Sequence, residues 1–216
     1  MAAKPLVLSI ALDFGASIER MHGTLIRRLR EKANFEQPEE VDEIISALRQ
    51  NPAPSAVLIM DQSVANDFPE VWDAVLAYVR AGGTAIAMGM FSSFIVPANI
   101  KPFFAKAGLS WEGGAYLRTD MKLRPEVAGA AAEKLPARFS MKGLLLKGVK
   151  AEAVMYSPDD GSQTQSAVFP SEKVQDTTQA AVAFAQVGAG KIGYVGDVNA
   201  EAELNDVILS MCGLLE

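Results

Sequence analysis

The 216-residue chain contains one histidine, His22, and one cysteine, Cys212. A structural zinc site takes three or four Cys and His ligands, so the chain alone lacks the residues for one. A single cysteine also excludes a disulfide within the chain. Ser–His–Asp and Cys–His catalysis would each depend on this one imidazole. The remaining chemistry therefore rests on carboxylates, hydroxyls and aromatic rings.

Three aspartates directly follow apolar runs that are typical of buried strands: Asp13, Asp61 and Asp197. We assign them as candidate catalytic residues, since carboxylates act as general acids and bases and also coordinate divalent cations. The alternative is that each aspartate caps the helix that follows it. The sequence shows no further motif for a metal or a cofactor, and we expect the protein to hold neither.

Candidate ligand-binding residues surround the same positions. Small, polar and aromatic side chains at strand ends suit a mostly apolar ligand that carries a few polar groups. These candidates are Phe14, Gly15, Gln62, Ser63, Gly89, Met90, Phe91, Ser92, Ser93, Gly196 and Asn199.

Two further candidates, Tyr116 and Arg118, lie in the second half of the chain after Gly113-Gly114. We expect this segment to extend over the same strand ends, where Arg118 would bind an anionic group of the ligand. The alternative for Arg118 is a surface salt bridge.

Strands and helices alternate through the first half of the chain. Short apolar runs at residues 6–12, 56–60 and 84–88 are typical of strands buried on both faces of a parallel sheet. Amphipathic helices are predicted over 17–29, 38–48 and 69–80, and a weak strand signal lies near Phe35. Ligands of open parallel sheets bind outside the carboxyl ends of the strands, which is why these ends supply the candidates.

The second half has a different character. From residue 111 to about 170 the segments are short and mixed, with strands predicted at 150–156 and 166–169. A hairpin with a glycine turn is predicted over 180–195, and a last amphipathic helix begins at Glu201.

Composition excludes several classes of partner. The formal net charge of −6 argues against a nucleic-acid surface, because binding DNA or RNA begins with the neutralisation of phosphates. No apolar run reaches the ~18 residues that a membrane-spanning helix needs. The apolar run that begins at Leu6 is too short for a secretory signal and is soon interrupted by Asp13. We therefore expect a cytoplasmic protein that binds neither nucleic acid nor membranes.

Two separated segments resemble class I glutamine amidotransferase-like domains, and most closely the ThuA-like (trehalose-utilisation) branch. Residues 76–91, LAYVRAGGTAIAMGMF, resemble the helix–glycine–strand–elbow unit, and residues 182–197, VAFAQVGAGKIGYVGD, resemble the closing hairpin. The resemblance implies a flavodoxin-like, three-layer α/β/α fold with a mostly parallel sheet and an added antiparallel hairpin. Residues 1–216 then form one domain, in which 111–170 is an insertion that serves as a subdomain or lid.

The departures from this family bear on function. Catalytic members carry a nucleophilic cysteine at the elbow and a histidine late in the chain, whereas this elbow reads Met88-Gly89-Met90-Phe91 and no histidine lies near Asp197. His22 and Cys212 lie on apolar helix faces, as expected of a packing histidine and an inert core thiol. The chain is therefore predicted not to be a glutaminase.

Three functions remain open on this sequence. The leading one is a non-amidotransferase, or pseudoenzyme, that binds a small molecule at the carboxyl ends of the strands. The second is a cofactor-independent enzyme, a hydrolase or an isomerase or lyase, that uses the strand-end carboxylates. The third is a structural or oligomerisation module, which would make a homo-oligomer the partner.

Overall fold

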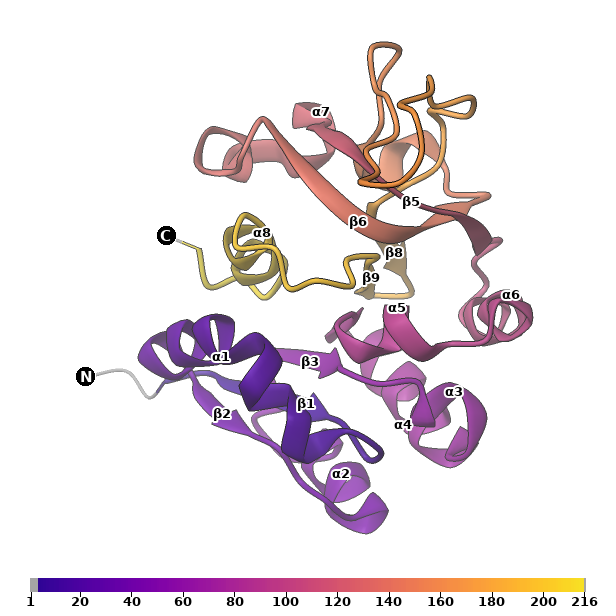
Figure 1. The fold of residues 1–216 in the computed structure, drawn as a ribbon. Helices are drawn as coiled ribbons and strands as arrows, with labels where there is room; N and C mark the ends of the chain where they lie inside the picture. The colour runs from indigo at the N-terminus through magenta and orange to yellow at the C-terminus, as the bar shows by residue number, and fades with distance from the viewer. Residues whose placement is uncertain (1–3, 216) are drawn as a thin grey trace.

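A computed structural model describes residues 4–215 of the chain (Figure 1). Within these residues, a nine-stranded sheet has the order β2-β1-β3-β4-β9-β8-β7-β5-β6. The strands are β1 (Leu6–Ile10), β2 (Asn34–Glu36), β3 (Ala56–Ile59), β4 (Thr84–Ala87), β5 (Glu112–Leu123), β6 (Arg138–Lys147), β7 (Val154–Ser157), β8 (Val182–Val187) and β9 (Gly190–Val195). The helices are α1 (Gly15–Lys32), α2 (Val41–Leu48), α3 (Ser63–Asn66), α4 (Pro69–Arg80), α5 (Met90–Phe94), α6 (Pro97–Ala105), α7 (Pro125–Ala128), α8 (Leu204–Met211) and the 3-10 helices η1 (Gly129–Lys134) and η2 (Ala151–Ala153).

The first half of the sheet is parallel, as its buried apolar runs predict. Strands β2, β1, β3, β4 and β9 pair in parallel in that order. Numbered along the chain, these five strands have the 2-1-3-4-5 order of flavodoxin-like sheets. The weak signal near Phe35 marks β2, a short edge strand.

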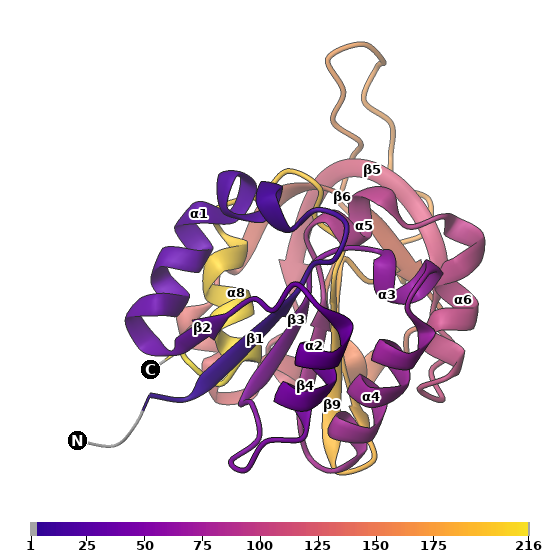
Figure 2. The same cartoon turned by 90° about the horizontal axis from the view of Figure 1, so that it is seen from below.

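Alternation along these strands builds a separate core on each face of the sheet. Leu58 and Met60 of the β3 run pack in one core with the apolar faces of α1 and α8. Val57 and Ile59 point the other way, into a core with α2, α4 and α6. Figure 2 shows α1 and α8 together on one side of the sheet and α2 and α4 on the other. Burial on both faces explains why these strands read as unbroken apolar runs.

The sheet is less parallel than predicted, because the segment from 111 to 170 extends it. Strands β8, β7, β5 and β6 all pair antiparallel with their neighbours, so the sheet has four antiparallel pairs beside four parallel ones. The predicted hairpin is β8–β9, and the predicted strand at 150–156 is shortened to β7. The predicted strand at 166–169 is wrong. Ser166 there accepts hydrogen bonds from the N–H groups of Val168 and Phe169, which folds the chain into a turn.

Backbone hydrogen bonds connect the long β5–β6 ribbon to the residues that follow β9. The Leu144 N–H donates to the Gly196 carbonyl at 2.9 Å, and the Val198 N–H donates to the Lys142 carbonyl at 3.1 Å. A side chain at Gly143 would place its Cβ 2.6 Å from the Gly196 oxygen, and one at Gly196 would lie 2.2 Å from the Leu144 oxygen. Glycine at both positions therefore permits this contact.

Cys212 tests the packing of the core that contains α1 and α8. Its thiol is 5% exposed at the end of α8, and burial raises its pKa to about 12. Because the thiolate is the reactive form, we expect alkylation of the native protein by iodoacetamide at pH 8 to be far slower than in urea. Mass spectrometry of quenched time points measures both rates. Rapid, stoichiometric labelling of the native chain would contradict the buried placement.

Candidate functional site

Asp61 lies at the end of β3 with none of its surface exposed. One carboxylate oxygen accepts the backbone N–H groups of Asp13 at 2.8 Å and Phe14 at 3.0 Å. The other accepts both the N–H and the hydroxyl of Ser63. Each oxygen thus has two donors, and the side chain ties the loop after β1 to the loop after β3. The Asp61 carboxylate therefore holds these two loops together at the switch point of the parallel sheet, where the strand order reverses.

Asp13 is the exposed carboxyl at the same switch point. It accepts a 2.7 Å hydrogen bond from the Gln62 amide. Partial burial and the negative charges of Asp61 and Asp67 raise the pKa of Asp13. Of the three strand-end aspartates, Asp13 is the one placed to exchange a proton with a bound molecule.

An aromatic pair borders this end of the sheet. Phe14 is half-buried and stacks on the half-exposed Phe94, with ring centroids 4.7 Å apart. Gly15 begins α1, and its carbonyl accepts from the Gln37 amide. The pair gives the switch point an apolar border beside Asp13.

The elbow after β4 leaves little room for a side chain. Gly89 has φ +66° and ψ −125°, and a Cβ there would lie 3.1 Å from His22 Nε2 and 3.2 Å from Met60 Cε. Positive φ at such a tight position favours glycine. Gly89 therefore contributes only backbone to the turn between β4 and α5.

The residues after the elbow mostly serve the core. Met90 and Phe91 are 6% and 0% exposed, and Phe91 packs against Phe103 with centroids 5.1 Å apart. Ser92 is buried and donates to the Val195 carbonyl at 2.7 Å. Ser93 alone among the elbow candidates is exposed.

His22 and Asp197 share a small cavity beside Gly89. The cavity, of about 10 Å³, is also lined by Glu201 and has room for about one water molecule. His22 lies at a kink in α1 and is 8% exposed, and burial lowers its pKa. The imidazole is therefore neutral at neutral pH.

Asp197 holds the turn that follows β9. Its carboxylate accepts the N–H groups of Asn199 at 3.1 Å and Glu201 at 2.9 Å. Between them Ala200 has φ +55°, a left-handed conformation that is uncommon for alanine. Burial raises the pKa of Asp197. Like Asp61, this carboxylate is engaged in holding backbone.

Arg118 joins the β5–β6 ribbon to that turn. Its guanidinium pairs with Glu201 and donates to the Ser140 hydroxyl at 3.2 Å. With its oxygen turned toward Arg118, the Asn199 amide accepts a further bond of 2.7 Å. The structure thus contains the salt bridge that was the alternative to anion binding, and it places Arg118 beside Asn199.

A cavity of about 980 Å³ lies between the ribbon and the 164–172 segment. Alternation along β5 and β6 puts Met121 and Met141 on the core face of the ribbon, while Tyr116, Arg118 and Lys142 line the cavity. Tyr116 is 58% exposed, and the Lys142 ammonium lies 5.3 Å above the centre of its ring. The full lining is Tyr116, Leu117, Arg118, Lys142, Thr164, Gln165, Ser166, Ala167, Phe169, Pro170 and Glu172.

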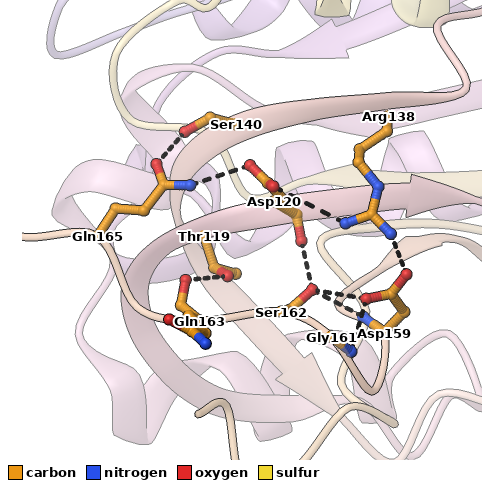
Figure 3. Close-up of polar contacts among 9 residues, drawn as sticks. All are labelled: Thr119, Asp120, Arg138, Ser140, Asp159, Gly161, Ser162, Gln163 and Gln165. Carbon is orange, nitrogen blue, oxygen red and sulfur yellow. Dashed lines mark hydrogen bonds and ion pairs between the residues drawn. The ribbon is translucent and has the colours of Figure 1, made fainter. Parts of the chain in front are cut away.

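A polar network holds the residues that lead into the 164–172 segment (Figure 3). Asp159 accepts hydrogen bonds from Arg138, from the Gly161 N–H and from the Ser162 hydroxyl. The Gln165 amide donates to Asp120 at 2.9 Å and accepts from Ser140 at 2.7 Å, as Figure 3 shows. Beyond this network, the loop projects from the body of the protein in orange in Figure 2.

The structure distributes the predicted residues over three places instead of one crevice. Asp13, Phe14, Gln62 and Ser63 meet at the switch point, and Gly89 meets Asp197 beside His22. Tyr116 and Arg118 line the large cavity.

Of the eleven lining residues the sequence interpretation named only Tyr116 and Arg118, and it missed nine: Leu117, Lys142, Thr164, Gln165, Ser166, Ala167, Phe169, Pro170 and Glu172. The alternation of residues 138–142 was a readable signal for a strand with one exposed face, and it would have placed Lys142.

Two properties of the described residues bear on partners. No group of three or more His, Cys, Asp or Glu side chains among residues 4–215 is arranged to hold a metal ion. None of the helices in that range is both long enough and apolar enough to cross a membrane.

Comparison with known proteins identifies the fold. No protein-family model matches the chain, and no curated protein matches it. Among solved structures, a ThuA-like protein from Bacteroides uniformis is similar over 100% of this chain and 93% of its own, with a TM-score of 0.62 and 11% identity. A cytoplasmic protein from Salmonella typhimurium is similar over 97% and 98%, with a TM-score of 0.54 and 12% identity.

The same fold also occurs inside a larger enzyme. A β-galactosidase from Bacillus circulans is similar over 98% of this chain but only 31% of its own, with a TM-score of 0.56 and 13% identity. The chain thus has an α/β fold that it shares with ThuA-like proteins and with about a third of that β-galactosidase.

Asp61→Asn tests whether this carboxylate holds the loops after β1 and β3 together. An amide keeps one acceptor but turns an NH₂ group toward two donors, so charge-assisted hydrogen bonds are lost. We expect the free energy of unfolding to fall by about 3 kcal/mol, measured by urea denaturation. Asp13→Asn is the control and should change it by less than about 1 kcal/mol, since Asp13 is exposed. Equal stability of Asp61→Asn and wild type would refute the role.

His22 predicts a pH dependence of stability. Because the fold disfavours the imidazolium, the unfolded chain binds more protons below pH 6.5, the ordinary pKa of histidine. The stabilisation is complete above pH 6.5 and decreases as the pH falls toward the lowered native pKa. As the chain has a single histidine, its Hε1 NMR signal reports this pKa directly. A native pKa at or above the value in urea would contradict the prediction.

Proposed function

We propose that this chain is a ThuA-like member of the class I glutamine amidotransferase-like superfamily that lacks amidotransferase chemistry and binds a small organic molecule. The three-layer arrangement of that superfamily agrees with helices packed in two cores on opposite sheet faces. The similarity to the ThuA-like protein from Bacteroides uniformis over the whole chain supports the branch. A cytoplasmic location is part of this proposal.

The geometry of the elbow argues against glutamine hydrolysis. Position 89 is a glycine that abuts His22, and it offers neither thiol nor hydroxyl. The one thiol, Cys212, is buried at the end of α8 with a strongly raised pKa. A neutral His22 without an adjacent nucleophile has nothing to activate.

The cavity between the ribbon and the 164–172 segment carries the proposal. Its volume of about 980 Å³ matches that of small-molecule sites. One wall is the ribbon, held by backbone pairing to the end of β9, and the other is a loop fixed at its base by Asp159 and Gln165. Arg118 connects this cavity to the turn that follows β9, because its guanidinium pairs with Glu201 and lies beside the Asn199 amide.

Asp13 favours a second candidate, a cofactor-independent hydrolase or isomerase or lyase. It is the exposed strand-end carboxyl, its pKa is raised, and the aromatic pair of Phe14 and Phe94 lies at the same end of the sheet. In this alternative Asp13 would act as the general acid or base.

A ligand screen with matched aromatic variants tests where a molecule binds. A ligand at 100 times its Kd should stabilise the wild type by about 2.7 kcal/mol in a thermal-shift measurement. Tyr116→Ala removes a ring from the cavity and should reduce this stabilisation. Phe94→Ala removes a comparably exposed ring at the switch point, and it should leave the stabilisation unchanged.

The two variants separate the candidates. If the ligand effect is lost in Phe94→Ala and kept in Tyr116→Ala, the binding site is at the switch point beside Asp13, and the cavity proposal fails. Absence of any stabilising compound across organic acids, sugars, nucleotides and amines would refute small-molecule binding altogether.

A further inference from the structure

Two cations face each other directly on the cavity wall. Arg118 of β5 and Lys142 of β6 are paired residues in the antiparallel register, and both line the cavity. Like charges at directly opposed positions repel each other and destabilise a strand pair. A negative group near both side chains would relieve that repulsion.

The protein itself supplies such a group to one cation only. Glu201 pairs with Arg118. Lys142 takes part in no ion pair among residues 4–215, and its ammonium lies over the ring of Tyr116. Glu172 lines the opposite, loop side of the cavity and makes no ion pair with Lys142. The ribbon wall therefore carries an ammonium without a counter-ion.

Aromatic rings line both walls of the same cavity. Tyr116 projects from the ribbon, and Phe169 belongs to the 164–172 segment. They are 58% and 73% exposed, which is unusual for side chains with this much apolar surface. Ser166 holds the turn that carries Phe169, because its hydroxyl accepts the Phe169 N–H at 3.1 Å.

Resting on the function proposed above, we infer that the cavity binds an organic anion that carries a flat ring. The anionic group, a carboxylate or a phosphate, lies against Lys142 beside Arg118. The ring lies between Tyr116 and Phe169, where stacking favours flat apolar surface. Glu172 on the far wall disfavours a second negative group at the other end of the ligand.

Calorimetric titration with phenyl phosphate tests this class of ligand. We expect phenyl phosphate to bind at least about tenfold more tightly than inorganic phosphate or benzyl alcohol, since each of these lacks one of the two features. Benzoate distinguishes carboxylate from phosphate as the anionic group. Raising NaCl from about 0.05 to 0.5 M should weaken phenyl phosphate binding several-fold, because salt screens the Lys142 charge.

Paired variants locate the two features. Lys142→Met keeps the apolar stem and removes the charge, and it should weaken phenyl phosphate binding roughly tenfold. Lys147→Met, at an exposed position at the end of the same strand, should leave the affinity unchanged. Phe169→Ala should weaken binding, whereas Val168→Ala, at the neighbouring exposed position outside the cavity, should not. Circular dichroism and melting curves confirm that each variant is folded.

The outcomes separate this inference from the proposed function. If a neutral ring compound or L-phenylalanine binds more tightly than phenyl phosphate and benzoate, and Tyr116→Ala abolishes that binding, the cavity is a binding site but the ligand is not an organic anion. Equal phenyl phosphate affinity in Lys142→Met and wild type also overturns the inference. If no compound binds at the cavity, both the inference and the proposed function fail.

Discussion

The backbone pairing between β6 and the residues that follow β9 holds the second half of the molecule in place. It depends on Gly143 and Gly196, where any side chain would overlap a carbonyl oxygen of the facing strand. The pairing places the middle of the β5–β6 ribbon beside the residues that follow β9. Through it, Arg118 reaches Glu201, and the polar face of the ribbon becomes the wall of a cavity.

Two of the three strand-end carboxylates are engaged in holding backbone. Asp61 holds two loops together, and Asp197 holds a turn with a left-handed alanine. Carboxylates that accept several N–H groups stabilise the surrounding backbone and have few free lone pairs. Asp61, Gly89 and Asp197 are buried, and of the three strand-end aspartates only Asp13 is exposed. The cavity proposed for a ligand lies on the added ribbon.

Strands β1, β3 and β4 were predictable because they are buried on both faces and give nearly unbroken apolar runs. The strand predicted at 166–169 was wrong, since Ser166 satisfies local N–H groups and leaves Val168 and Phe169 exposed. In β6 the residues up to Lys142 alternate between buried and less buried positions, so Lys142 and its neighbours carried a weaker signal. The roles of Gly143 and Gly196 come from contacts between segments about 50 residues apart, which local patterns do not report.

The sequence by itself determined the α/β class, the parallel strands, the residues that follow each strand, and the absence of a cysteine at the elbow. These properties depend on local periodicity and composition, which short-range rules describe. Only the tertiary structure decided which carboxylates accept backbone N–H groups and that Arg118 pairs with Glu201. It also decided that Tyr116, Lys142 and Phe169 line one cavity. Those outcomes depend on the register and curvature of the ribbon, which long-range backbone pairing sets.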